Sequence, residues 1–247
     1  MARRRDVNRR QLISASVLIG SSLALDGAQA GSISGKVPWQ PDEANKPTIV
    51  QPGPNQFFTS DEAEFIDAAI SRLIPNDELG PGAKEADVAL FLDRQLAGPF
   101  GKASSWYMHG PWSKGERTQG YQSRMKPAEL YRAAIKAIDA HCTGKFGGKK
   151  FSALTPDQQD QVLSGLEKGD ITLKGADAKT FFKMFLQNTI EGFFSDPIYG
   201  GNRDMVGWKL IGFPGAHYDY RPYVEKHGQK LNMPPVGIKG RPGWMPS

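Results

Sequence analysis

The sequence predicts a mainly α fold: a compact domain of about five helices, with long loops rich in glycine and proline and extended arms at both ends. Apolar residues recur at helical spacing in five segments between residues 59 and 194. No segment shows the sustained alternation of a confident strand. The 28 glycines and 18 prolines among 247 residues favour many turns and irregular stretches. Together these observations indicate one helical domain.

The first two predicted helices lie between residues 59 and 98. Thr59 and Glu62 have the spacing of a capping box, so a helix should begin there and end before Pro75. Its apolar stripe consists of Phe65, Ile66, Ala69, Ile70, Leu73 and Ile74. The second helix has one apolar face and stops at Gly98-Pro99. That face consists of Val88, Phe91, Leu92 and Leu96.

Three further helices follow a loop-like stretch at residues 99–124. The third helix begins at Pro127, which suits the first position of a helix. Its stripe consists of Leu130, Tyr131, Ala134, Ile135, Ile138 and Cys142. Thr155 and Gln158 form a second capping box and start a short fourth helix. The fifth helix, about residues 177–194, is apolar around most of its circumference, so it should be the central and most buried one.

The first 30 residues have the features of an export signal. Arginines crowd the start, an apolar run extends from Leu12 to Leu25, and Ala28 and Ala30 form an A-x-A cleavage site. Arg9 and Arg10, followed by apolar residues, resemble the twin-arginine motif. An uncleaved membrane anchor is the alternative, but a run of about 14 residues is shorter than the ~20 that span a bilayer. We therefore expect cleavage after about Ala30 and a periplasmic location.

The mature chain is predicted to have three parts. Residues 31–56 and 218–247 are rich in proline and lack periodicity, which predicts extended arms on either side of a helical domain at 57–217. Without the five arginines and two aspartates of the signal, 26 basic and 24 acidic residues remain, so the mature chain is nearly neutral. No basic face interleaved with aromatic residues is evident, and a nucleic-acid partner is therefore excluded.

No residue set has the pattern of a catalytic, cofactor-binding or metal site. His217 and Asp219 could pair as a base and an orienting carboxylate, but residues two apart on an irregular segment fix no geometry. His141 and Cys142 would point about 100° apart on a helix, without a second ligand pair. Motifs for haem attachment, phosphate binding and dinucleotide binding are absent. We therefore expect no cofactor in this chain, and an enzyme would need an unrecognised site.

Cys142 is the single cysteine, so it cannot form an internal disulfide. One interpretation is a buried, small apolar residue near the end of the third helix. The other is a thiol near the surface, because a glycine-rich loop follows at once and a cysteine of another chain could reach it.

The stretch at residues 193–216 reads FFSDPIYGGNRDMVGWKLIGFPGA. Its two adjacent glycines permit a tight turn, and it offers no nucleophile or general base. Tyrosine, tryptophan and arginine are the residue types that dominate protein–protein hot spots. The candidate interface residues are Tyr199, Asn202, Arg203, Asp204, Trp208, Lys209 and Phe213. The alternative is a loop that folds back over the core of its own chain, and both interpretations can hold.

This stretch, together with FFKMFLQ and the segment FFTSDEAEFIDAAISRLIPNDELGPGAKEADVALFLDRQL, resembles the gluconate 2-dehydrogenase subunit 3 family. The resemblance covers roughly residues 55–218. The pattern D-P-x-Y-G-G-N-x-x-x-x-G-W-x-x-x-G-x-P-G carries most of it.

The resemblance implies a non-catalytic small subunit of a membrane-associated sugar, sugar-acid or polyol dehydrogenase. Such subunits pair with a large FAD-bearing subunit, and usually with a multi-haem cytochrome c that holds haem c. The large subunit commonly lacks a signal, so the small one carries it out through the twin-arginine translocase. The family also implies an intersubunit disulfide, for which Cys142 is the candidate. Because proline-rich chains lose less entropy on docking than flexible ones, we expect both arms to lie on the partner. The rival hypothesis is a self-contained exported enzyme or small-ligand binder that uses the loop at 196–213.

Overall fold

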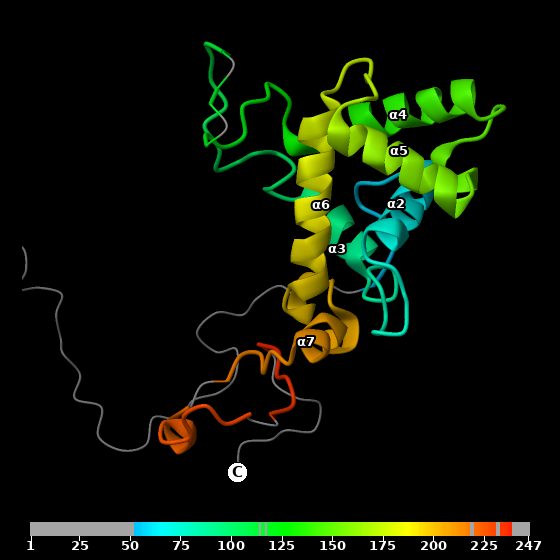
Figure 1. Ribbon diagram of the computed structural model, residues 1–247. Helices are drawn as coiled ribbons and strands as arrows, with labels where there is room; N and C mark the ends of the chain where they lie inside the picture. Colours follow the sequence, from blue (N-terminus) through cyan, green and yellow to red (C-terminus); the bar gives the residue numbers. More distant parts are fainter. Residues whose placement is uncertain (1–51, 114, 117, 218–219, 231–232, 239–247) are drawn as a thin grey trace, which may run out of the picture. The chain divides into compact units, whose positions relative to one another are not determined.

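A computed structural model describes residues 52–113, 115–116, 118–217, 220–230 and 233–238 (Figure 1). The mainly α fold is confirmed, and all five predicted helices are present. They are α2 (Ser60–Leu73), α3 (Val88–Ala97), α4 (Pro127–Lys145), α5 (Pro156–Lys168) and α6 (Ala178–Phe194). A short further helix, α7 (Val206–Ile211), lies in the stretch that the sequence presented as a loop.

Single-turn 3-10 helices and isolated bridges complete the described regular structure. The 3-10 turns are Phe151–Ala153, Pro197–Tyr199, Arg203–Met205 and Arg221–Tyr223. In the described ranges, the only β pairing consists of two isolated bridges, Asp77 with Gly80 and Gly215 with Val236. None of the described helices is long and apolar enough to cross a membrane.

The helix starts follow from the caps that the sequence predicted. In α2, the Thr59 N–H donates to Glu62 Oε2 (2.9 Å) and the Glu62 N–H donates to Thr59 Oγ1 (3.3 Å). Thr155 and Gln158 form the same reciprocal pair at the start of α5. Each pair satisfies a helix N–H that would otherwise lack a partner, so both predicted capping boxes are confirmed.

Helix α6 lies at the centre of the described domain, as predicted. It packs against α2, α3, α4, α5 and α7 (Figure 1). The Asn188 side chain of α6 donates to the hydroxyl of Tyr131 on α4 (2.9 Å), and both residues are buried. Burial raises the pKa of Tyr131 above its ordinary value, so its hydroxyl stays neutral. The burial of α6 is not uniform, however, because Ile190 is exposed and Met184 is only partly covered.

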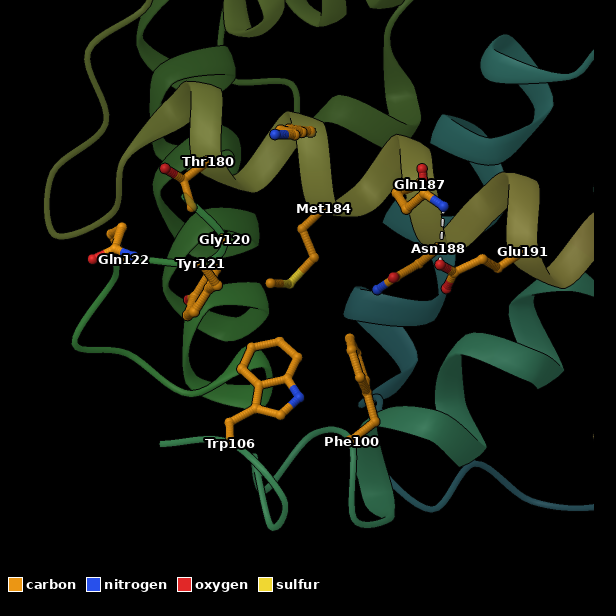
Figure 2. Close-up of a pocket in the computed structure, with 11 residues that line it drawn as sticks. Phe100, Trp106, Gly120, Tyr121, Gln122, Thr180, Met184, Gln187, Asn188 and Glu191 are labelled. Carbon is orange, nitrogen blue, oxygen red and sulfur yellow. Dashed lines mark hydrogen bonds between the residues drawn. The ribbon is translucent and has the colours of Figure 1, made fainter. Parts of the chain in front are cut away.

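The stretch at residues 99–124 lies beside α6 and leaves a groove of about 410 Å³ between them (Figure 2). Phe100, Trp106 and Tyr121 line the groove from this stretch, and Met184 points into it from α6. The partly covered Met184 therefore faces the groove, whereas the exposed Ile190 is not among the lining residues.

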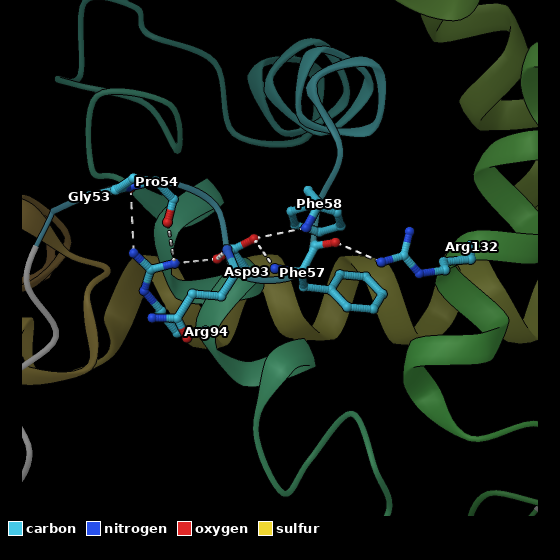
Figure 3. Close-up of polar contacts among 8 residues, drawn as sticks. Gly53, Pro54, Phe57, Phe58, Asp93, Arg94 and Arg132 are labelled. Atoms are coloured by element: carbon cyan, nitrogen blue, oxygen red, sulfur yellow. Dashed lines mark hydrogen bonds and ion pairs between the residues drawn. The ribbon is translucent and has the colours of Figure 1, made fainter.

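Residues 53–58, which we call the anchor segment, are fixed to α3 by Asp93 (Figure 3). The carboxylate of Asp93 is 1% exposed and accepts the backbone N–H groups of Gln56 (2.8 Å), Phe57 (2.9 Å) and Phe58 (2.9 Å). Arg94 forms an ion pair with the same carboxylate and also donates to the Pro54 carbonyl (3.1 Å). The predicted arm at 31–56 therefore ends in a segment that is bonded to the domain; residues 1–51 lie outside the described residues.

The other side of the anchor segment is held by Arg132 of α4. Its guanidinium lies over the Phe57 ring (4.3 Å to the centroid) and donates to the Phe57 carbonyl (2.7 Å). The same guanidinium donates to both carboxylate oxygens of Glu62, the capping residue of α2. One arginine therefore connects α4, the start of α2 and the anchor segment.

Candidate functional site

The candidate site is the stretch at residues 196–215, which we call the corner segment. It follows α6 directly and contains α7. Asp196 begins it: one carboxylate oxygen accepts the Ile198 N–H (3.0 Å) and the other accepts the Ile238 N–H (2.7 Å). Asp196 thus caps a 3-10 turn and also ties residue 238 to the end of α6.

Asn202 connects the end of α6 to α7. Its side chain is completely buried, and its amide donates to the Ser195 carbonyl (2.8 Å) and accepts from the Gly207 N–H (2.8 Å). The backbone of Asn202 is left-handed, with φ 49°, a region that asparagine tolerates better than most residues. Asn202 is therefore part of the scaffold of the corner segment.

Three glycines allow backbone contacts that no side chain would permit. A Cβ at Gly201 would lie 2.2 Å from the Gly192 carbonyl oxygen, and one at Gly207 would lie 2.2 Å from that of Phe193. Such distances essentially never occur for real Cβ atoms. Gly215 meets the Val236 carbonyl in the same way, where the two residues form a bridge. Gly201 and Gly207 therefore let the corner segment pack backbone to backbone on the end of α6, and Gly215 lets it pack on residue 236.

Trp208 packs inward and fixes α7. It is buried, and its indole Nε1 donates to the Phe194 carbonyl at the end of α6 (2.7 Å). The Trp208 and Phe213 rings make an edge contact, with centroids 5.2 Å apart. The large aromatic side chain of Trp208 thus packs between α7 and the end of α6, and its polar Nε1 atom has a hydrogen-bond acceptor.

Three residues of the corner segment other than glycine adopt left-handed backbone conformations. They are Asn202 (φ 49°), Asp204 (φ 54°) and Met205 (φ 55°). Such conformations cost on the order of 1–3 kcal/mol each and persist where the surroundings over-determine them, often at functional sites. The strain makes the corner segment a better functional candidate than the regular helices around it.

Arg203 joins the corner segment to the loop before α3. Its guanidinium forms an ion pair with Asp87, and its backbone N–H donates to the Ala86 carbonyl (3.1 Å). Burial raises the pKa of the Asp87 carboxyl, and the nearby Arg203 opposes that rise. The pair therefore compensates a carboxylate that is partly removed from water.

The residues predicted to contact a partner divide into two groups. Asn202 and Trp208 are buried and bond to the backbone of their own chain. The exposed or half-exposed residues are Tyr199, Arg203, Asp204, Lys209 and Phe213. The interpretation of a loop that folds back over its own core thus describes Asn202 and Trp208, and contact of the exposed residues with a partner stays a prediction.

Sequence reasoning missed Leu210 and Ile211. Their side chains are 48% and 60% exposed, and with Tyr199 (43%) and Phe213 (44%) they form an exposed apolar set that we call the apolar face. Helical geometry could have indicated that these residues are exposed. If Trp208 of α7 points inward, Leu210 lies about 200° further around the helix and must point away from the core.

Cys142 lies in the core on α4, with no exposed surface and no disulfide. Burial raises the pKa of its thiol to about 11, so at neutral pH the thiol is protonated and a poor nucleophile. A crosslink to another chain would need α4 or the following loop to open, and this crosslink stays a prediction. The predicted signal residues Arg9, Arg10, Ala28 and Ala30 lie outside the described residues.

The histidines do not gather into a site in the described part of the chain. The Nε2 atoms of His141 and His217 are buried there without a hydrogen-bond partner. Burial, together with nearby Lys145, lowers the pKa of His141. Asp219, the suggested partner of His217, is outside the described residues. Among the described residues, no three histidine, cysteine, aspartate or glutamate side chains are grouped so that they could hold a metal ion.

The fold and the corner segment define an α-helical domain that carries a tight, glycine-packed turn with an exposed apolar face. The family model for gluconate 2-dehydrogenase subunit 3 matches residues 60–215, from the start of α2 to the end of the corner segment. The chain therefore belongs to this family, and the family prediction made from the sequence is confirmed. No curated protein and no solved structure matches the chain.

Proposed function

We propose that this chain is the non-catalytic small subunit of a periplasmic, flavin-dependent dehydrogenase complex. The family is that of a dehydrogenase subunit. The partner would be a large flavoprotein that holds FAD and oxidises a sugar, sugar acid or polyol, and a multi-haem cytochrome c would accept the electrons. The small subunit contributes surface, stability and the export signal.

The observation that carries this proposal is the apolar face on a strained, tightly packed scaffold. Leu210, Ile211 and Phe213 are close in sequence, and each is roughly half exposed or more. Their scaffold is held by Asn202, the Trp208 indole and the glycine contacts described above. A preorganised apolar surface loses little conformational entropy on binding, which suits it to a stable interface.

Charged residues beside the apolar face suit the rim of such an interface. Arg203, Asp204 and Lys209 are exposed and lie between the apolar positions in the sequence. Interfaces typically surround an apolar and aromatic centre with a polar rim. We propose that the apolar face contacts the flavoprotein and that these charged residues surround the contact.

The export role rests on the signal at residues 1–30. The twin-arginine route carries folded proteins, so a flavoprotein that lacks a signal can travel with a partner that has one. Arg9 and Arg10 would be read by the translocase and the signal removed after about Ala30. The mature complex would then lie at the periplasmic side of the inner membrane.

The interface is tested by co-expressing the chain with the proposed flavoprotein partner. Ile211→Glu should reduce co-purification of the flavoprotein at least tenfold, because a carboxylate buried in an apolar interface costs more than about 1.4 kcal/mol. Leu79→Glu is the matched control, since Leu79 is 75% exposed in the turn between Asp77 and Gly80. Equal losses for both variants, or none for either, would contradict the proposed interface.

The export role is tested separately by replacing Arg9 and Arg10 with lysine. The flavoprotein should then stay in the cytoplasm, as measured by dehydrogenase activity in separated periplasmic and cytoplasmic fractions. A flavoprotein that still reaches the periplasm would disprove co-export. Sugar oxidation by the purified chain alone, with a dye as acceptor, would instead favour the rival hypothesis of a self-contained enzyme.

A further inference from the structure

One wall of the groove beside α6 is aromatic, and the other wall, formed by α6, carries both apolar and polar side chains (Figure 2). Phe100 and Trp106 make an edge contact (centroids 5.7 Å apart), and Trp106 and Tyr121 lie 5.2 Å apart. Tyr121 is fixed because its hydroxyl donates to the Met125 carbonyl (2.7 Å). Met184 contributes an apolar surface opposite these rings. The aromatic wall is therefore built before any occupant arrives.

The dimensions of the groove suit an extended peptide. It follows α6 from Thr180 to Glu191, a rise of roughly 16 Å at 1.5 Å per residue. Aromatic-lined grooves of this kind bind proline-bearing segments, which are extended before binding and so lose little entropy. Gln187 and Glu191 add polar groups at one end of the helical wall.

One segment of this chain begins close to that end. Ile238 is bonded to Asp196, five residues after Glu191, so roughly 10 Å of chain separates Glu191 from this attachment point. Residues 239–247, KGRPGWMPS, follow directly and lie outside the described residues. In an extended proline-type conformation of about 3.1 Å per residue, Arg241 to Pro246 would span ~16 Å, the length of the groove.

The chemistry of this segment complements the groove. Its cations, Lys239 and Arg241, come first and would meet the exposed carboxylate of Glu191. Trp244 and Met245, between two prolines, come later and would meet the aromatic wall and Met184. Except for Lys183, which lies beside Met184 in the lining, the order of charged and apolar residues along the segment matches their order along the groove.

We propose that residues 239–247 of this chain bind in the groove between α6 and residues 99–124. The segment would place Arg241 beside Glu191 and Trp244 with Met245 against Trp106 and Met184. This differs from the expectation that the whole C-terminal arm lies on the partner. It would connect the corner segment, through Ile238, to the loop on the other side of α6.

The test uses the full mature chain with Cys142→Ala and two new cysteines. Met184→Cys with Met245→Cys should form an intramolecular disulfide under mild oxidation, measured by mass spectrometry after thiol alkylation. Ile190→Cys with Met245→Cys is the matched control, because Ile190 is exposed on α6 but points about 120° away from Met184 around the helix axis. The groove pair should close at least tenfold faster than the control pair.

Charge reversal tests the register. Arg241→Glu should slow closure of the groove pair about two- to fivefold, the range for a partly exposed ion pair, and adding Glu191→Arg should restore it. Equal closure of the groove and control pairs, or closure of neither, would overturn the proposal and leave the groove to a small molecule or another chain. If the double charge reversal did not restore the rate of disulfide formation, the proposed pairing of Arg241 with Glu191 would be wrong.

Discussion

The anchor segment and the corner segment are both irregular, and each depends on a buried polar side chain. They differ in how many residues provide the contacts that hold the segment in place. In the anchor segment one carboxylate, that of Asp93, accepts three backbone N–H groups and pairs with Arg94. In the corner segment the neutral amide of Asn202 shares the task with Asp196, Trp208 and three glycine contacts. In the first arrangement one carboxylate makes most of the contacts, with Arg132 holding the Phe57 side, whereas the second spreads its contacts over several residues.

The difference fits the positions of the two segments. The anchor segment fixes the point where the predicted N-terminal arm leaves the domain, and two attachments, Asp93 and Arg132, are enough for that. The corner segment must hold several exposed side chains in a defined arrangement against left-handed backbone strain. Many small contacts then over-determine a conformation that no single contact would maintain.

The strongest test of this comparison is Asp93→Ala. The substitution leaves three backbone N–H groups and the Arg94 guanidinium without their acceptor, so we expect a loss of about 3–5 kcal/mol of unfolding free energy. Urea unfolding followed by circular dichroism measures it. Asp61→Ala is the control, because Asp61 is exposed and pairs only with Lys150 at the surface, and it should cost less than about 1 kcal/mol. Similar losses for both variants would show that the anchor segment does not depend on Asp93.

The second test is Asn202→Ala, which removes the bonds to Ser195 and Gly207 and leaves alanine in a left-handed conformation. We expect a loss of about 2–3 kcal/mol, less than for Asp93→Ala, because Asp196 and Trp208 still hold the corner segment. Asn202→Gly loses the same bonds but tolerates the backbone, so it should recover about 1 kcal/mol. A loss as large as that of Asp93→Ala would mean that the corner segment also depends on one residue.

The five long helices could be predicted because their signals are local. Apolar stripes and capping boxes lie within single helices, as at Thr59 and Glu62, and their physical causes act over three or four residues. Asp93 could not be identified in this way. Its partners lie 35 to 37 residues earlier in the chain, and they are backbone N–H groups that leave no mark in the sequence.

The corner segment was predictable in part. Gly200 and Gly201 indicated a tight turn, and the aromatic and basic residues indicated a contact surface. Helix α7 was missed because six residues give too few turns for a periodic pattern. The division of the predicted residues into buried and exposed ones depends on the end of α6, against which Asn202 and Trp208 pack. Sequence spacing alone carries no information about that contact.

A smaller effect is expected from Trp208→Phe. Phenylalanine keeps most of the buried aromatic surface but cannot donate to the Phe194 carbonyl, so the loss should be about 1–2 kcal/mol. Differential scanning calorimetry at neutral pH measures it. If the corner segment is as redundant as we infer, Trp208→Phe combined with Asn202→Ala should cost more than the sum of the two single losses, because each substitution removes support on which the other relies. Strict additivity would argue against shared support.

The smallest effect concerns the charged contact between the corner segment and the loop before α3. Burial raises the pKa of Asp87 in the folded chain, so the folded state binds its proton more tightly than the unfolded state does. The contribution of Asp87 to stability is therefore fully present below the unfolded pKa of about 3.9 and declines as pH rises through the raised folded value. Asp87→Asn removes this titration, so its unfolding free energy relative to the wild type should increase between pH 3.5 and pH 7.

The expected change is below about 1 kcal/mol, since Asp87 is only partly buried and Arg203 offsets its burial. Urea midpoints of both proteins at the two pH values measure it, and Asp170→Asn, at an exposed aspartate, controls for general effects of removing an aspartate. If instead the unfolding free energy of the wild type increased relative to that of the variant as pH rises, the attraction of Arg203 would have a larger effect on the pKa of Asp87 than burial has. The Arg203–Asp87 ion pair would then stabilise the corner segment, as the Arg94–Asp93 pair stabilises the anchor segment. The two segments would then differ only in how many contacts hold each of them.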